Sequence, residues 1–217
     1  MKIAVLGTGP VGRTLGRKLV SLGHSVVLGS RTADNREAGD WAGSAGSGAR
    51  ADTFAGATAG AELVINATGG GVSLLALEAA GPANLADKVL LDVSNPLDFS
   101  AGFPPTLSVL NTDSIAESIQ RAFPSARVVK ALNTLAAPLM VDPLSLAGGD
   151  HDVFMAGDDG GAKAIVRGLL EDFGWLPDHI RDLGPLEAAR GMEMYLPLWL
   201  RLMGSVGNPA FNIRIVQ

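Results

Sequence analysis

A short apolar run, a glycine-rich turn and a helix-forming segment follow one another at the start of this chain. Residues 2–6 read KIAVL, residues 7–12 read GTGPVG, and the pattern over residues 13–22 is helical. This order of strand, turn and helix is the context in which G-x-G-x-x-G indicates dinucleotide binding. The chain has 28 glycines, which makes chance matches more frequent, so the flanking strand and helix carry the prediction.

Each glycine of this turn has its own expected task. Gly7 permits the tight turn, Gly9 lets a pyrophosphate approach the backbone, and Gly12 lets the helix pack closely against the strand. The pyrophosphate would lie at the helix N-terminus, where free N–H groups and the helix dipole favour negative charge. The residues expected to contact the dinucleotide here are Gly7, Thr8, Gly9, Pro10, Val11 and Gly12.

The end of the second strand indicates which dinucleotide binds. The run over residues 25–28 leads into Gly29, Ser30 and Arg31, where an NAD-specific site has Asp or Glu for the ribose 2′-hydroxyl. A carboxylate would repel a 2′-phosphate, whereas a guanidinium and a hydroxyl bind it with charge-assisted hydrogen bonds. Arg36 is placed to close over the same phosphate or to stack on the adenine. We therefore predict NADP(H) rather than NAD(H).

Composition is that of a cytoplasmic enzyme and excludes several other classes. The formal net charge of −5, without any lysine or arginine run, argues against a nucleic-acid-binding protein. The absence of cysteine excludes disulfides, thiolate metal sites and dithiol redox chemistry, and we expect no metal site. No apolar stretch approaches membrane-spanning length, and a strand begins at residue 2, so we expect neither a membrane span nor a signal peptide.

Strand and helix patterns alternate along the chain. Further strands are expected at residues 49–52, 63–67, 88–93 and 127–131, with helices over residues 72–80 and 114–122 and a loop over residues 40–48. This alternation predicts an α/β protein with a Rossmann-like, doubly wound, mostly parallel sheet. Ligands of such sheets bind beyond the carboxyl ends of the strands. That rule adds as candidate cofactor-binding residues Thr68, Gly69, Gly70, Asn95 and Pro96.

The remainder of the chain is expected to form a second, smaller part. Residues 153–156 suggest a strand, residues 162–173 a helix, and residues 185–203 a long helix with an apolar face. We predict a Rossmann NADP-binding domain over residues 1–150 and a small C-terminal α+β domain over residues 151–217. This second domain would complete the acceptor cleft and provide a dimer contact, although core packing also explains the apolar face.

An NADP(H)-dependent enzyme that reduces a carbonyl by hydride transfer also needs a proton donor. Few residues of this chain are placed to be that donor. His24 and His151 precede strands and are expected at the amino edge, opposite the site, and His179 has no predicted route to the nicotinamide. Lys130, at the end of its strand, is the one plausible acid, although a structural or phosphate-facing role explains it equally well. An acceptor that takes a hydride without a positioned acid fits better, and a second flat redox cofactor is such an acceptor.

The order of several motifs carries a resemblance. The segments at residues 7–12, 29–31, 94–97, 130–134, 157–159 and 182–190 together resemble the NADPH-dependent reductases of the deazaflavin coenzyme F-420. The resemblance implies a homodimeric enzyme that moves hydride between NADP and the deazaflavin. It further implies that Asn133 and Leu135 lie near the deazaflavin. The possible catalytic residues are therefore Asn133, from the resemblance, and Lys130, from its place at the end of its strand. The chain departs from archaeal members at Gly69–Gly71 and at Asn133, where those tend to have bulkier polar residues and histidine respectively.

Other activities remain open on the sequence. One alternative is an NADPH-dependent reductase of a flavin, a quinone or ferric iron. Another is a non-catalytic protein that senses NADP(H) and reports to a protein partner. Turnover on an acceptor distinguishes the enzymes from the sensor.

Overall fold

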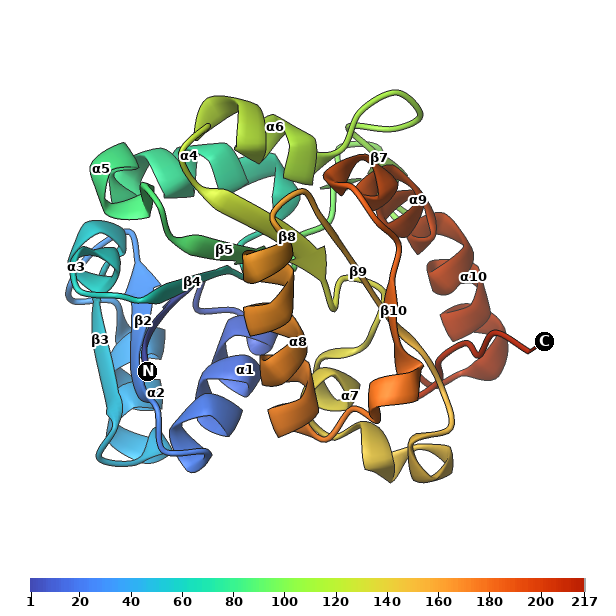
Figure 1. The fold of residues 1–217 in the computed structure, drawn as a ribbon, viewed down its shortest axis with the longest axis horizontal. Coiled ribbons are helices and arrows are strands. Elements are labelled where there is room, and N and C mark those ends of the chain that lie inside the picture. The colour runs from blue at the N-terminus through green and yellow to red at the C-terminus, as the bar shows by residue number, and fades with distance from the viewer. Residues whose placement is uncertain (217) are drawn as a thin grey trace.

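A single large sheet forms the centre of the molecule in the computed structural model, which describes residues 1–216 (Figure 1). The sheet has the strand order β10-β9-β8-β5-β4-β1-β2-β3. Its strands are β1 (Lys2–Leu6), β2 (Ser25–Ser30), β3 (Ala49–Thr53), β4 (Leu63–Asn66), β5 (Val89–Asp92), β8 (Arg127–Ala131), β9 (Val153–Gly157) and β10 (Ile180–Asp182). A separate antiparallel pair, β6 (Leu97–Asp98) and β7 (Thr106–Leu107), lies outside it.

The strands from β3 across to β8 run parallel, as the alternating pattern predicted. The chain builds β1, β2 and β3 in one direction and then returns to place β4 on the other side of β1. The carboxyl ends of β1 and β4 therefore mark the point where the strand order reverses, which is where doubly wound sheets bind ligands. The fold is thus the predicted Rossmann-like α/β fold.

Helices cover both faces of the sheet (Figure 1). One core contains side chains of α1, α2, α7 and α8, and the other contains side chains of α3, α4, α5 and α6. The helices are α1 (Pro10–Ser21), α2 (Arg36–Ala45), α3 (Phe54–Ala59), α4 (Gly70–Ala80), α5 (Pro82–Leu85), α6 (Ile115–Ala122), α7 (Ala137–Val141), α8 (Gly160–Phe173), α9 (Ala189–Met194) and α10 (Leu196–Val206). Short 3-10 turns connect them at Pro143–Ser145, Ala147–Gly149, Pro177–His179 and Leu186–Ala188.

The expectation of a loop over residues 40–48 was wrong, because α2 occupies most of that segment. The side chain of Asn35 caps the helix by accepting a hydrogen bond from the N–H of Ala38 at 2.9 Å. Trp41 is fully buried, and its ring lies so close to Gly16 of α1 that a Cβ there would meet it at 2.6 Å. Small residues gave the segment the composition of a loop, but one cap and one buried tryptophan are enough to hold it as a helix.

The C-terminal part continues the same sheet. β9 pairs antiparallel with β8, and β10 pairs parallel with β9. The expected long helix over residues 185–203 is divided into a 3-10 turn, α9 and α10, and Pro197, which has no N–H to donate, stands in the first turn of α10. A domain boundary at residue 150 therefore stays a prediction, and the sheet is continuous across that position.

Residues 212–215 return from α10 to the start of β9 and are held there by Asp152. The carboxylate of Asp152 accepts hydrogen bonds from the N–H of Ile215 at 2.6 Å and from Nε of Arg181 at 3.1 Å, and Nδ1 of His179 lies 2.9 Å away. Burial alone would raise the pKa of Asp152, but these hydrogen bonds outweigh it and hold that pKa below its ordinary value. Ionised Asp152 therefore ties the tail to the sheet.

No helix within residues 1–216 is long and apolar enough to cross a membrane. Over the same residues, no cluster of His, Asp and Glu side chains is arranged to hold a metal ion.

Candidate active site

A groove runs along the carboxyl edge of the sheet at the point where the strand order reverses. It consists of two adjoining cavities of about 650 and 390 Å³. The two cavities share several lining residues, among them Gly9 and Val72. The larger, which we call the adenosine cavity, lies over the loops after β1, β2 and β4. The smaller, which we call the nicotinamide cavity, lies over the loops after β1, β4 and β5. These names state the halves of a dinucleotide that each would hold.

The structure shows why glycine stands at each of the three glycine positions of the first turn. Gly7 has φ +115°, and a Cβ on it would meet the carbonyl oxygen of Ala67 at 2.6 Å. A Cβ on Gly12 would meet the carbonyl oxygen of Gly7 at 2.1 Å, so α1 packs closely on the turn only because Gly12 has no side chain. A Cβ on Gly9 would meet no protein atom within 4 Å, and Gly9 lines both cavities. Gly9 therefore leaves space for a ligand, whereas Gly7 and Gly12 hold the turn itself.

Helix α1 points its N-terminus into the groove. Its N-cap is Gly9, no side chain caps it, and Pro10 stands in the first turn. The first N–H groups of a helix have no partner within the helix, and its dipole adds positive potential there. Backbone donors and an open cradle over Gly9 thus coincide at one point, which fits a pyrophosphate.

The end of β2 supplies the only cation that lines the groove within residues 1–216. Arg31 lines the adenosine cavity, is exposed, and forms no hydrogen bond or ion pair with that part of the chain. Ser30 is 4% exposed and donates its hydroxyl proton to the carbonyl oxygen of Thr32 at 2.5 Å. Arg36, in contrast, does not line the cavity. It lies in the first turn of α2 with its side chain 93% exposed and its Nε 3.7 Å from Asp40.

Thr8 adds a polar contact at the rim of the adenosine cavity. Its hydroxyl donates to Oε2 of Glu37 at 3.1 Å. Thr8 lines the cavity, while Glu37 lies outside it, so a ligand phosphate over the turn would compete with Glu37 for this one proton.

The rest of the adenosine cavity is apolar apart from Asn35 and Thr68. Phe54 at the start of α3 lines it, and α4 contributes the exposed Val72, Leu75 and Ala79 and the buried Ala76. A largely apolar cavity beside an arginine is suited to an adenine and its phosphorylated ribose.

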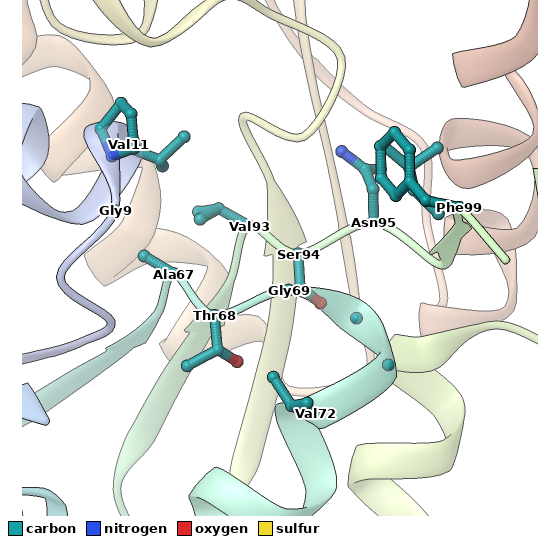
Figure 2. A pocket seen from close by; sticks show the side chains of 14 residues that line it. Gly9, Val11, Ala67, Thr68, Gly69, Val72, Val93, Ser94, Asn95 and Phe99 are labelled. Atoms are coloured by element: carbon teal, nitrogen blue, oxygen red, sulfur yellow. The ribbon is translucent and has the colours of Figure 1, made fainter. Parts of the chain in front are cut away.

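The nicotinamide cavity has a different lining. Figure 2 shows Val11 on one side and Asn95 and Phe99 on the other, with Ala67, Val93 and Ser94 between them. The remaining lining residues are Gly9, Pro10, Thr68, Gly69, Gly70, Gly71, Val72 and Leu97. No acidic or basic side chain is among them.

The three glycines after β4 differ in purpose. A Cβ on Gly70 would meet the carbonyl oxygen of Asn95 at 2.2 Å, and the N–H of Gly70 donates to that oxygen at 3.1 Å. Gly70 therefore joins the loop after β4 to the loop after β5. A Cβ on Gly69 or Gly71 would meet nothing within 4 Å, so these two leave the cavity open.

A buried polar network lies behind the nicotinamide cavity. Asp92 Oδ1 accepts from the amide of Asn66 at 2.8 Å and from the hydroxyl of Ser94 at 2.8 Å. The amide oxygen of Asn66 accepts from the hydroxyl of Thr68 at 2.6 Å. Asp92 thus holds Ser94 directly and holds Thr68 through Asn66, and both Ser94 and Thr68 line the cavity.

Lys130 belongs to this network and lines neither cavity. Its side chain is fully buried, and its Nζ lies 2.7 Å from Asp92, 2.7 Å from Glu193 and 2.6 Å from the carbonyl oxygen of Ser94. Burial would lower the pKa of Lys130, but the two carboxylates outweigh it and raise that pKa. Burial also raises the pKa of Glu193, against the influence of Lys130. Lys130 is therefore held as a cation away from the groove. This arrangement favours a structural role for Lys130 over a role as proton donor.

Glu193 connects the C-terminal part to the sheet. Its carboxylate accepts from the N–H of Ile115 at 2.9 Å and of Ala116 at 3.3 Å, at the N-terminus of α6. An ionised side chain is favourable at that helix end. One carboxylate of α9 thus caps α6 and also neutralises Lys130.

Three of the predicted acceptor and cofactor residues lie just outside the groove. Asn133 is buried, exchanges hydrogen bonds with Asn95, and donates to the carbonyl oxygen of Met192 at 3.0 Å. Leu135 is 7% exposed in the core, and Pro96 is buried between two lining residues. Asn133 therefore orients Asn95 rather than facing the cavity, and its predicted contact with an acceptor stays untested.

The expectation for His151 was wrong, because it assumed that β9 runs parallel to its neighbours. The antiparallel pairing of β9 with β8 places the start of β9 beyond the carboxyl end of β8. His151 is buried there, with Nε2 2.9 Å from the carbonyl oxygen of Pro143 and its ring against Trp175. It lines neither cavity, and neither do His24 and His179.

Several lining residues have no motif that marks them. They are Asn35, Phe54, Ala67, Val72, Leu75, Ala76, Ala79, Val93 and Phe99. Gly71, Ser94 and Leu97 fall at strand ends that the carboxyl-edge rule indicates. For the lining residues on α4, the available sequence signal was that this helix has exposed apolar side chains and lies next to the dinucleotide-binding turn.

Comparisons with known proteins agree with this geometry. Residues 2–96 match the family model described as NADP oxidoreductase, coenzyme F-420-dependent. A solved structure from Arthrobacter sp. FB24, named for a proposed F-420-dependent NADP reductase, is 51% identical, with a TM-score of 0.94 and coverage of 100% of both chains. The metalloreductase STEAP3 of Rattus norvegicus is 31% identical over 207 residues, which are 91% of this chain but only 38% of that protein. A reductive aminase of Aspergillus terreus, solved with NADPH and ethyl levulinate, shares the fold at 20% identity, with a TM-score of 0.67 over 94% of this chain and 62% of that one.

Proposed function

Because the chain belongs to the family of coenzyme F-420-dependent NADP oxidoreductases, we propose that it transfers a hydride between NADP(H) and the deazaflavin coenzyme F-420. The family assignment makes the chain an NADP-dependent oxidoreductase. The identity of the acceptor is the proposal, and so are the residues that hold the two cofactors.

The groove fits NADP(H) along its whole length. The guanidinium of Arg31, which forms no ion pair within residues 1–216, would bind the 2′-phosphate, and Phe54 would lie against the adenine. The hydroxyl of Ser30 would join this contact by turning its proton away from the carbonyl oxygen of Thr32. The pyrophosphate would lie over Gly9, where the structure leaves open space at the start of α1. The nicotinamide would then enter the second cavity near Val11.

The observation that carries the choice of acceptor is the absence of ionisable side chains from the lining of the nicotinamide cavity within residues 1–216. NADPH supplies the hydride, and a deazaflavin takes up that hydride together with one proton from water, so no protein acid is needed. The chain's part is to hold two rings close and in line and to keep the walls free of competing charge. Thr68, Ser94 and Asn95 are the polar side chains of this lining, and each is held by a hydrogen bond to the residues behind the cavity.

We also propose a homodimer. The helices α9 and α10 expose Met194, Leu198 and Val206. These side chains lie on the last two helices of the chain, at one end of the molecule (Figure 1). A contact between two copies would remove this apolar surface from water.

Anaerobic stopped-flow absorbance tests the proposal. Purified protein is mixed with NADPH and oxidised deazaflavin, with riboflavin, FMN and a ferric chelate in parallel. Fast bleaching of the deazaflavin, well above the rates with the other acceptors, is the expected result. Turnover with a flavin or the ferric chelate alone would contradict it and would favour the second candidate, a flavin or ferric reductase, to which the identity with STEAP3 points.

A further inference from the structure

Phe99 is the one aromatic side chain that lines the nicotinamide cavity within residues 1–216. It is 58% exposed, although its ring is large and apolar. Single exposed apolar residues are common on protein surfaces and need no explanation. Phe99 differs because its exposed ring borders a cavity that already has the features of a cofactor site.

The backbone that carries Phe99 is well fixed. Phe99 directly follows β6, whose Leu97 pairs with Leu107 of β7. The carbonyl oxygen of Phe99 accepts from the N–H of Gly102 at 2.9 Å, and the next N–H, of Ser100, donates to the side chain of Asp98 at 2.9 Å. The backbone position of Phe99 is therefore set by a hydrogen-bonded hairpin, while its exposed ring stays free to contact a ligand.

The placement of Phe99 leaves space for a second ring. A dinucleotide that crosses Gly9 brings its nicotinamide to the side of Val11, and Phe99 lies on the opposite side of the cavity (Figure 2). We infer that Phe99 stacks on the outer face of the electron acceptor, so that the acceptor ring lies between Phe99 and the nicotinamide. The inference deepens the proposed function and rests on it.

This arrangement selects a chemical class of acceptor. Aromatic rings prefer offset stacking, and the other cavity walls are glycine, short apolar side chains and neutral polar groups. A planar, conjugated ring system is stabilised by stacking in such a cavity, whereas a hydrated ferric chelate or a small aliphatic imine is not. Phe99 is thus a binding residue that favours deazaflavin or flavin rings over non-planar acceptors.

Equilibrium binding tests the role of Phe99 without turnover. Oxidised deazaflavin is dialysed against the complex of protein and NADP⁺, in which no hydride is available. Phe99→Leu removes the aromatic face, Phe99→Tyr keeps it, and Phe103→Leu is the matched control. Phe103 lies on the same hairpin loop, is 71% exposed and lines neither cavity.

We expect Phe99→Leu to raise the Kd for deazaflavin roughly tenfold, a typical loss for one aromatic stacking partner. Phe99→Tyr and Phe103→Leu should keep the wild-type Kd, and all variants should keep the wild-type Kd for NADP⁺. In turnover assays, Phe99→Leu should raise the KM for the acceptor and leave the KM for NADPH unchanged.

Three results would overturn the inference. They are an unchanged deazaflavin Kd in Phe99→Leu, an equal loss in Phe103→Leu, and a parallel loss of NADP⁺ affinity in Phe99→Leu. If the wild-type complex binds no deazaflavin, the proposed function fails, and riboflavin in the same dialysis decides the inference alone. A tenfold effect of Phe99→Leu on riboflavin would support it, and no binding or no difference would overturn it.

Discussion

Removal of Lys130 should destabilise the fold rather than abolish a proton transfer. Its Nζ makes three contacts of 2.6–2.7 Å, and the side chains of Lys130, Asp92 and Glu193 are 0%, 0% and 2% exposed. Removing one partner of a buried ion pair costs about 3–5 kcal/mol, because a charge is left buried without compensation. Lys130→Met leaves two such carboxylates, so we expect the upper part of that range. For a chain of this length, that corresponds to a fall in Tm of roughly 8–20 °C.

Thermal unfolding followed by circular dichroism measures this fall, and Glu193→Gln is the companion variant. The double variant Lys130→Met/Glu193→Gln should be more stable than Lys130→Met alone, because one of the two uncompensated charges has been removed. Burial raises the pKa of Glu193, and Lys130→Met removes the cation that opposes this effect, so folded Glu193 binds its proton more tightly still. The loss of stability should therefore shrink as the pH falls.

The outcome that refutes this reasoning is specific. If Lys130→Met kept the wild-type Tm while kcat fell steeply, the contacts of Lys130 with Asp92 and Glu193 would not be what stabilises the fold. A proton-donating role would then be the better explanation, and the proposed acceptor chemistry without a protein acid would lose its main support.

Three further predictions concern the cofactor and the tail. Arg31→Ala should weaken NADPH binding by about 1.5–3 kcal/mol and barely change NADH binding, as measured by fluorescence titration, and equal losses would refute the assignment of the 2′-phosphate to Arg31. Gly9→Val should still fold, because a Cβ at residue 9 meets no protein atom within 4 Å, with only the small loss of Tm expected for valine at a helix N-cap, but it should lose both NADPH and NADH; normal binding would mean that the turn is only structural. Ionised Asp152 stabilises the fold above its ordinary pKa of 3.8, so the advantage of wild type over Asp152→Asn in unfolding experiments should disappear as the pH falls below that value, and a constant advantage would contradict it.

The sequence predicted the parts of the site that depend on local backbone chemistry. A strand, a glycine turn and a helix start leave a recognisable pattern, and the structure gives Gly7, Gly9 and Gly12 separate geometric reasons. The parallel order of the central strands followed from buried apolar runs separated by helices. Arg31 could be placed because it directly follows one of those strands.

The missed features depend on contacts between distant segments. α2 was mistaken for a loop because its stability comes from Trp41 packing against Gly16 of another helix. His151 was placed on the wrong edge because strand direction is not encoded in a short apolar run. Lys130 remained a candidate acid because its second counter-charge, Glu193, lies far along the chain. Phe99 was missed because an aromatic residue in a loop carries no motif.

Transfer of the label from NADPH deuterated at C4 tests the central claim most directly. The (4R)- and (4S)-labelled forms are each incubated with the protein and oxidised deazaflavin, and the reduced deazaflavin is analysed by mass spectrometry. Our account predicts that one of the two forms delivers its deuterium to the deazaflavin, because the groove holds the nicotinamide in one orientation beside the acceptor. Deuterium in neither product, or no reduction of the deazaflavin at all, would contradict it.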